Sequence, residues 1–149
     1  MPVKPVPKGY RTVTPYLVVP GAANLIEFLR KAFRAKERLR MARPDGGIAH
    51  AEVKIGNSIV MMGEPMPGMD AMPAMLYLYV KEVDKTYARA LKAGATSVRE
   101  PADQFYGDRN AAVKDSFGNQ WFIATHMEDI TPEEMAKRTE AAMKQQPAG

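Results

Sequence analysis

The chain has 149 residues, of which 46% are hydrophobic and 26% charged, the balance of one compact domain or of two closely joined small halves. It contains no cysteine, which excludes disulfides, thiolate metal sites and a cysteine nucleophile. No apolar run approaches the length of a membrane span and the N-terminus lacks an apolar signal core, so a cytoplasmic protein is expected.

The formal net charge is +4, and basic residues cluster between Arg30 and Arg43. Such a cluster could contact nucleic acid, but Phe33, Leu39 and Met41 interrupt it at positions expected to alternate into a core. Acidic residues elsewhere nearly balance the charge. A solvated basic face is therefore expected, and no nucleic-acid partner.

The chain begins with an arm, followed by a strand and a helix. Residues 1–9 are rich in proline, which predicts an extended, poorly ordered arm. Residues 12–19 alternate like a strand, with Val13, Leu17 and Val19 on one face. An amphipathic helix should follow, because apolar residues recur at helical spacing: Leu25, Ile26, Leu29 and Phe33.

Three strands are expected next, at about 36–43, 48–55 and 58–63. The last two should be joined by a hairpin turn at Gly56-Asn57. The following segment, 64–74, is built from proline, glycine and methionine and should be a loop.

The same order of elements then restarts. Residues 75–80 read as a strand, and a helix with Asp84 as its N-cap and Gly94 as its stop should follow. Three further strands are expected: 96–100, 110–114 and 120–126. A last helix should begin with Thr131 as its N-cap.

The two halves also share residues at nearly constant spacing. The matches are Tyr16-Leu17 with Tyr77-Leu78, Ala51, Val53 and Lys54 with Ala111, Val113 and Lys114, and Gly56-Asn57 with Gly118-Asn119. This spacing predicts two copies of a β-α-β-β-β unit, 10–66 and 67–128, then a C-terminal helix and tail, 129–149. The predicted fold class is α+β, with curved mixed sheets around a cavity.

Three segments carry a resemblance to a known family: "TPYLVVPGAANLIEFLRKAF", "HAEVKIGNSIVMM" and "DQFYGDRNAAVKDSFGNQWFIATHMEDITPEEM". With its tandem units and a D-x-x-G-N turn before the last strand, the chain resembles the vicinal-oxygen-chelate superfamily. That superfamily includes glyoxalase I, extradiol dioxygenases and bleomycin-resistance proteins, and the PhnB-like branch is most similar. The branch commonly has proline at the position of Ser116 and tyrosine at that of Leu29.

The resemblance covers about residues 10–138 and implies a fold more specifically than a function. The superfamily spans lyases, dioxygenases, epimerases and proteins that only bind drugs. Its members are usually homodimers, so a second copy of the chain is an expected partner. The C-terminal helix, which has only a thin apolar stripe, is expected to pack across the subunit boundary.

Strand alternation predicts which side chains face the cavity: Thr14, Tyr16, His50, Glu52, Lys54, Ile59, Met61, Met75, Tyr77, Tyr79, Trp121, Ile123 and Thr125. Aromatic and methionine side chains suit an apolar or aromatic small molecule. The predicted ligand-binding residues are Tyr16, Met61, Met75, Tyr77, Tyr79, Tyr106, Arg109, Trp121 and Ile123. Alternatively, this set packs against the other unit or another subunit and leaves little room.

The "QFYGDR" loop, which contains Tyr106 and Arg109, could close over the cavity. Arg109 would then pair with an acidic ligand. It could equally pair with Asp108 or with an acidic surface residue.

Metal-using members of the resembled superfamily hold one divalent ion through His or Glu on the first and last strands of both units. Carried over by position, these ligands fall at Thr14, Met61, Met75 and Ile123. None of the four is a usual ligand for a hard or borderline cation. No metal cofactor is therefore expected, and metal-dependent glyoxalase or dioxygenase activity is not expected.

His50 and Glu52 lie two positions apart on a predicted strand, so their side chains share a face. They are the candidate catalytic pair, because a carboxylate beside an imidazole tunes it for acid–base work. They could instead be a structural polar pair. With His126 they would also make a chemically sensible displaced zinc site, although nothing in the sequence brings His126 to them.

Three functions remain open. The first is metal-independent binding of a small molecule, sequestering an apolar or aromatic compound. The second is a lyase or isomerase that uses His50 and Glu52, with or without a displaced divalent metal. The third is an inactive, structural or regulatory module whose dimer surface is its function.

Overall fold

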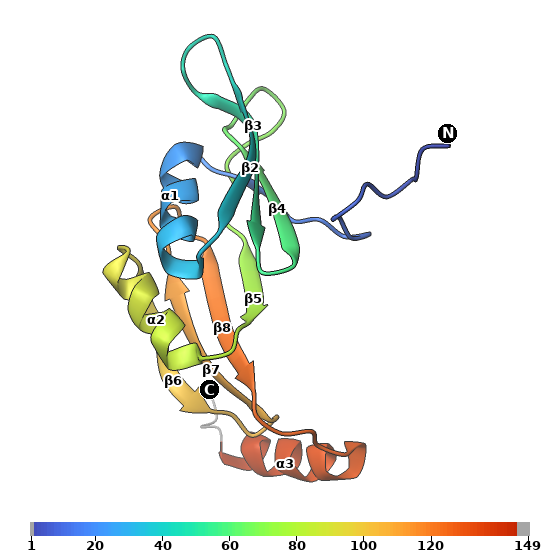
Figure 1. Cartoon of the computed structure of the whole chain (residues 1–149). Coiled ribbons are helices and arrows are strands. Elements are labelled where there is room, and N and C mark those ends of the chain that lie inside the picture. The colour runs from blue at the N-terminus through green and yellow to red at the C-terminus, as the bar shows by residue number, and fades with distance from the viewer. Residues whose placement is uncertain (1, 146–149) are drawn as a thin grey trace.

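A computed structural model describes residues 2–145 of the chain and shows two β-α-β-β-β units followed by a C-terminal helix (Figure 1). The first unit comprises β1 (Tyr16–Val18), α1 (Ala22–Phe33), β2 (Lys36–Ala42), β3 (Ile48–Ile55) and β4 (Ser58–Gly63). The second comprises β5 (Met75–Tyr79), α2 (Val83–Lys92), β6 (Thr96–Asp103), β7 (Asp108–Lys114) and β8 (Gln120–His126). The helix α3 spans Pro132–Gln145, and residues 146–149 of the predicted tail lie outside the described residues. The predicted α+β class is confirmed.

Each unit forms one four-stranded mixed sheet. The strand orders are β1-β4-β3-β2 and β5-β8-β7-β6. In both sheets the first strand pairs in parallel with the last, and the other neighbours are antiparallel. The duplicated strand order that the repeat predicts is therefore present.

The two helices cover the same side of the two sheets, and the N-terminal arm leaves on the opposite side (Figure 1). The apolar stripe of α1 is buried as predicted, and it packs on the sheet. Phe33, at the end of α1, contacts Trp121 of β8 with 5.4 Å between ring centroids. Because one cluster of buried side chains includes both rings, the units share a continuous hydrophobic core.

Three local predictions are wrong. Val13 was expected to face α1, but β1 begins only at Tyr16 and Val13 is 82% exposed. Leu39 and Met41, expected in the core, pair opposite Glu52 and His50 and so share the uncovered face with them.

Asp84 is not the N-cap of α2. That position is Glu82, and Asp84 lies in the first turn. Its carboxylate accepts two hydrogen bonds from Arg109, at 2.8 and 3.0 Å, instead of capping a backbone N–H of the helix. Thr131 does cap α3, where its hydroxyl accepts the backbone N–H of Glu134 at 3.2 Å.

The predicted orientation of Trp121, Ile123 and Thr125 is also wrong. β8 pairs with β5 so that Trp121 lies beside Leu76 and Ile123 beside Leu78, on the helix-covered face. The side chains of Trp121 and Ile123 are completely buried in the core. Thr125 donates to the carbonyl of Val80 and accepts from the N–H of Val83, at the start of α2.

This error in orientation arises from the length of the turn before β8. Tyr16 pairs with Met61 in the first unit and Tyr77 with Phe122 in the second, so Met61 corresponds to Phe122. Glu52 pairs with Met61 and Ala112 with Phe122, so the second turn contains one residue more. Matching the two Gly-Asn pairs therefore misaligned the last strand by one position, and a shift of one residue exchanges the two faces of a strand.

Asp115 organises this longer turn. Its carboxylate accepts hydrogen bonds from four groups: the backbone N–H of Phe117 and of Asn119, the side-chain amide of Asn119 and the Trp121 indole N–H, all at 2.9–3.0 Å. Asn119 in turn accepts the N–H of Ala74 at 2.9 Å, just before β5. The D-x-x-G-N motif is thus a structural turn that fixes the position of Trp121.

Candidate functional site

The face of each sheet that the helices leave uncovered, here called the open face, is rich in aromatic and methionine side chains. The strand registers put Tyr16 and Met61 on it in the first unit, and Met75, Tyr77, Tyr79 and Phe122 in the second. Tyr77 and Phe122 stack with 5.9 Å between centroids. Met75 is 66% and Tyr79 64% exposed, so within one chain this surface is not enclosed as a cavity.

A polar cluster lies on the open face of the first unit. The buried Glu52 accepts a hydrogen bond from the Tyr10 hydroxyl, and His50 Nε2 lies 2.8 Å from the other Glu52 oxygen. His50 Nδ1 lies 3.2 Å from the hydroxyl of Tyr16. This Glu52 cluster ties the segment before β1 to the sheet, because Tyr10 directly follows the arm of residues 1–9.

Opposing effects set the charge state of Glu52. Burial raises the pKa of this carboxyl, but hydrogen bonds from Tyr10 and His50, together with the charges of His50 and Arg38, lower it below its ordinary value. Glu52 is therefore a carboxylate at neutral pH. The hydrogen bond to it raises the pKa of Tyr10, which stays a phenol.

A second polar cluster, the Asp108 cluster, lies on the open face of the other unit. The buried Asp108 accepts hydrogen bonds from the hydroxyls of Tyr77 at 2.8 Å and Tyr79 at 3.0 Å. Its other oxygen lies 3.0 Å from Nδ1 of His126. Asn110 donates to the hydroxyls of Tyr77 and Tyr106, at 3.1 and 2.7 Å.

Several pKa values shift in the Asp108 cluster. Burial raises the pKa of Asp108, but hydrogen bonds from His126, Tyr77 and Tyr79 outweigh it and lower the pKa below the ordinary value. Burial, with the nearby Asp108 charge, raises the pKa of Tyr77. His126 lies between Asp108 and Asp129, and hydrogen bonds to both carboxylates raise its pKa above 6.5.

The position of His126 predicts a pH-dependent stability. A histidine whose pKa is raised by folding stabilises the native state fully below its unfolded pKa, and this contribution disappears as pH rises through the folded pKa. We expect wild type to melt above His126→Gln at pH 5.5 and the difference to vanish by pH 9. Melting curves at both values test this.

The matched control is Asp129→Asn, which removes one of the two carboxylate partners and should reduce the raised pKa of His126 without abolishing the shift. An NMR titration of the His126 ring would measure its pKa in the wild type and in Asp129→Asn. A native His126 pKa at or below 6.5 would contradict the arrangement.

Arg109 pairs with acidic surface residues, one of the alternatives that the sequence left open. Its guanidinium binds Asp84 through two hydrogen bonds and Asp103 at 3.2 Å. It does not pair with Asp108. Tyr106 lies on the open face, where it contacts Asn110 and packs edge-on against Phe105 with 5.1 Å between centroids.

His126 does not join His50 and Glu52. It lies in the second unit, held by Asp108 and Asp129, and no three His, Asp or Glu side chains among residues 2–145 come together as a metal site. In the strand register, the fourth position that the resemblance implies for a metal ligand is Phe122 rather than Ile123. Neither side chain, nor Thr14, Met61 or Met75, offers a suitable donor, so the residues present do not fit a divalent ion at these positions.

Comparison with known proteins agrees with this architecture. Residues 11–123 match the model of the family described as Glyoxalase/Bleomycin resistance protein/Dioxygenase superfamily. The chain belongs to this superfamily. Curated members that resemble it include the uncharacterized protein Mb0911c of Mycobacterium bovis, 36% identical over 92% of this chain and 95% of its own. The uncharacterized protein Rv0887c of Mycobacterium tuberculosis is also 36% identical, over 92% and 85%.

Several solved structures share the fold of this chain. TioX from Micromonospora sp. ML1 superposes with a TM-score of 0.67 at 24% identity, covering 78% of this chain and 99% of its own. A PhnB protein from Bacillus cereus superposes with a TM-score of 0.61 at 13% identity, covering 77% and 99%. The predicted superfamily is confirmed by the family model, and the likeness to the PhnB protein extends to the fold. Among the described residues, no helix has the length and apolar character needed to cross a membrane.

Sequence reasoning missed several residues of this superfamily member's open faces. Asp108 is one of them: it shares a face of β7 with Asn110, but the strand was expected to begin only at Asn110. Phe122 was missed through the one-residue slip. No sequence signal pointed to Tyr10, because its partner Glu52 is 42 positions away and the arm just before Tyr10 has no periodic pattern.

Proposed function

We propose that the protein binds a small apolar or aromatic molecule on the open faces of its sheets, without a metal ion, and sequesters it between two copies of the chain. The supporting observation is the composition of these faces. Tyr16, Tyr77 and Tyr79 combine flat apolar rings with exposure to solvent, and Met61 and Met75 add adaptable apolar surface. Superfamily membership is consistent with this role, since the resembled proteins include drug binders.

A second copy of the chain is the cover that we propose for the open faces. Large apolar side chains exposed on one continuous side of a protein mark an interaction surface. Met41 and Leu39 on β2 extend the exposed apolar surface of the first unit. The helix α3 contributes none of its side chains to the core of its own chain, which also leaves it available to a partner.

The polar clusters give the site its specificity. The carboxylates of Glu52 and Asp108 are each held by tyrosine hydroxyls and a histidine, so both faces present fixed hydrogen-bonding groups beside aromatic rings. A ligand pocket needs few such groups among apolar neighbours to orient a molecule. We therefore expect a ligand with an aromatic body and one or two polar substituents.

A thermal-shift titration with 1-naphthol tests the proposal. A ligand that binds only the native state stabilises it by about 2.7 kcal/mol at a hundredfold excess over its Kd, so the melting temperature should rise with 1-naphthol concentration. Tyr16→Ala removes an exposed ring and should abolish most of this rise. Tyr16→Phe keeps the ring and is the matched control, which should retain it. Equal shifts in both variants, or none in the wild type, would rule out the open face as the site.

A second candidate function follows from the geometry of His50. Its two ring nitrogens lie 2.8 Å from Glu52 and 3.2 Å from the Tyr16 hydroxyl, an arrangement suited to moving a proton. An isomerase or lyase that removes a proton next to a carbonyl would incorporate deuterium into its substrate in heavy water. NMR of small keto acids incubated with the protein would detect such exchange, and His50→Gln should lose it while remaining folded, as judged by circular dichroism.

A further inference from the structure

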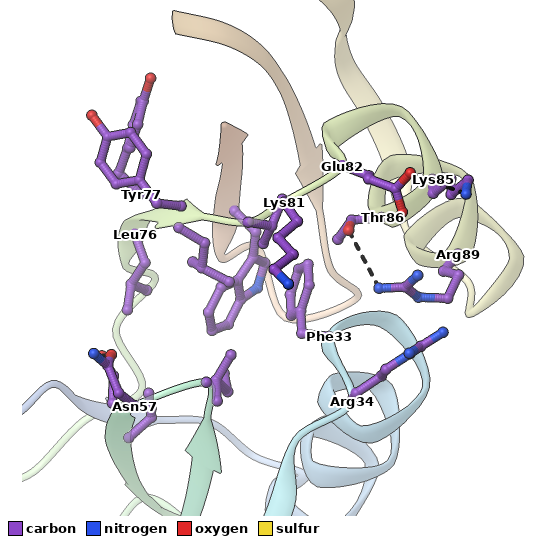
Figure 2. Close-up of a pocket in the computed structure, with 18 of the residues that line it drawn as sticks. Phe33, Arg34, Asn57, Leu76, Tyr77, Lys81, Glu82, Lys85, Thr86 and Arg89 are labelled. Atoms are coloured by element: carbon purple, nitrogen blue, oxygen red, sulfur yellow. Dashed lines mark hydrogen bonds and ion pairs between the residues drawn. The ribbon is translucent and has the colours of Figure 1, made fainter. Parts of the chain in front are cut away.

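A cleft of about 790 Å³ separates the two units on the helix-covered side of β5 (Figure 2). Its volume falls in the range of pockets that hold drug-sized molecules. Phe33, Val60 and Trp121 are buried side chains that form its apolar wall, and Leu76 and Leu78 of β5 continue this wall. Tyr77 and Tyr79 border the cleft as well, but their hydroxyls point away from it to Asp108 on the open face, so the two surfaces lie on opposite sides of β5.

The rim of the cleft is positively charged. Arg34 follows the end of α1, and Arg89 lies on α2 at the same side of the cleft; Lys81 precedes α2 (Figure 2). Lys85 also lines the rim, but it is neutralised by Glu82 at 3.0 Å.

Three of these cations have no anionic partner. Within residues 2–145, the ion pairs include none made by Arg34, Lys81 or Arg89. Arg89 donates only to neutral acceptors, the Ala32 carbonyl and the Thr86 hydroxyl, both at 3.3 Å. Uncompensated cations around an apolar cleft attract an anion with an apolar body.

The backbone of Arg34 adds an independent observation. Arg34 has a φ of 57° and is the non-glycine residue with positive φ among those described. Helices commonly end on glycine in this conformation, and a residue with a Cβ pays about 1 kcal/mol for it. The chain thus holds a guanidinium at the cleft at a position where glycine would be less strained, and such strain is often associated with a binding role.

We infer that this cleft binds an amphipathic carboxylate, with its apolar body along Leu76 and Leu78 and its carboxylate between Arg34, Arg89 and Lys81. This site is additional to the open faces and does not depend on the function proposed for them. The aliphatic or aromatic tail would lie along β5, where the cleft wall is apolar. A longer apolar body would therefore bind more tightly than a short one.

The test compares 6-phenylhexanoate with 6-phenylhexan-1-ol, which share an apolar body and differ in charge. Trp121, the only tryptophan, lines the cleft, so its fluorescence should change on binding. We expect the carboxylate to bind at least about tenfold more tightly than the alcohol. Arg34→Gly should weaken the carboxylate by about tenfold while raising the melting temperature, because it removes the strain at that residue.

Lys144→Gln, which loses the same charge on α3, is the matched control and should leave carboxylate binding unchanged. Tyr16→Ala should also leave carboxylate binding unchanged, because Tyr16 lies on the open face. Conversely, Arg34→Gly should not alter the rise in melting temperature caused by 1-naphthol. Equal affinities for the carboxylate and the alcohol, or unchanged carboxylate affinity in Arg34→Gly, would overturn the inference. No saturable binding of 6-phenylhexanoate by calorimetry, as when a second copy fills the cleft, would overturn it too.

Discussion

Replacing Asp115 by alanine should lower the free energy of unfolding by about 4 kcal/mol, a large effect for a single polar side chain. The carboxylate is buried and accepts four hydrogen bonds. Alanine would leave the Trp121 indole N–H in the core without an acceptor, and an unsatisfied buried donor is costly. Because Trp121 packs on Phe33, the damage should spread to the contact between the units.

Urea denaturation followed by Trp121 fluorescence measures this loss, and the near-ultraviolet circular dichroism of the ring should weaken as well. Asp103→Ala is the matched control, because its exposed carboxylate makes one ion pair, with Arg109, and should cost no more than about 1 kcal/mol. A loss below 1 kcal/mol in Asp115→Ala would show that the turn does not hold Trp121 in place.

The second large effect concerns self-association. Met75→Lys places a charge in the middle of the exposed apolar surface that we propose a second copy covers. Burying an unpaired ammonium in an apolar contact costs several kcal/mol, so the dimer dissociation constant should rise by about a hundredfold or more. Sedimentation equilibrium should then report a mass of 16.5 kDa instead of twice that value.

Met127→Lys tests whether position matters. Met127 is as exposed as Met75, at 60%, but lies after β8 and off the sheet. This variant should keep the dimer mass and the shift caused by 1-naphthol. A wild-type protein that sediments at 16.5 kDa at all concentrations would contradict the proposal that a second copy covers the open faces. If Met75→Lys and Met127→Lys both remain dimers, the contact between copies lies elsewhere.

Local patterns in the sequence were sufficient to predict most of the fold. β3 and β4 have the predicted bounds because the alternation is clear and the Gly56-Asn57 turn between them is short. The stripe of α1 is equally clear. β1 is shorter than its alternating pattern, since only Tyr16–Val18 reach their partner strand β4.

The candidate site was less predictable, because faces depend on register. One additional residue in the second turn was enough to exchange Trp121 for Phe122 on the open face. Arg109 illustrates a different limit: both of its partners, Asp84 and Asp103, belong to other elements, so only the folded arrangement could choose between the alternatives. Contacts across many positions, such as Tyr10 with Glu52, have no local pattern at all.

The strands β2 and β6 are outer strands of the two sheets, and the position of β2 gives a structural reason for the basic residues between Arg30 and Arg43. In the sheet order, each ends its sheet with unpaired backbone groups, and all seven residues of β2 are exposed. Both strands depart from regular pairing, and β2 carries Lys36, Arg38 and Arg40. Charges and bulges at such margins oppose strand addition, so growth of the sheets through the edges of β2 and β6 is disfavoured.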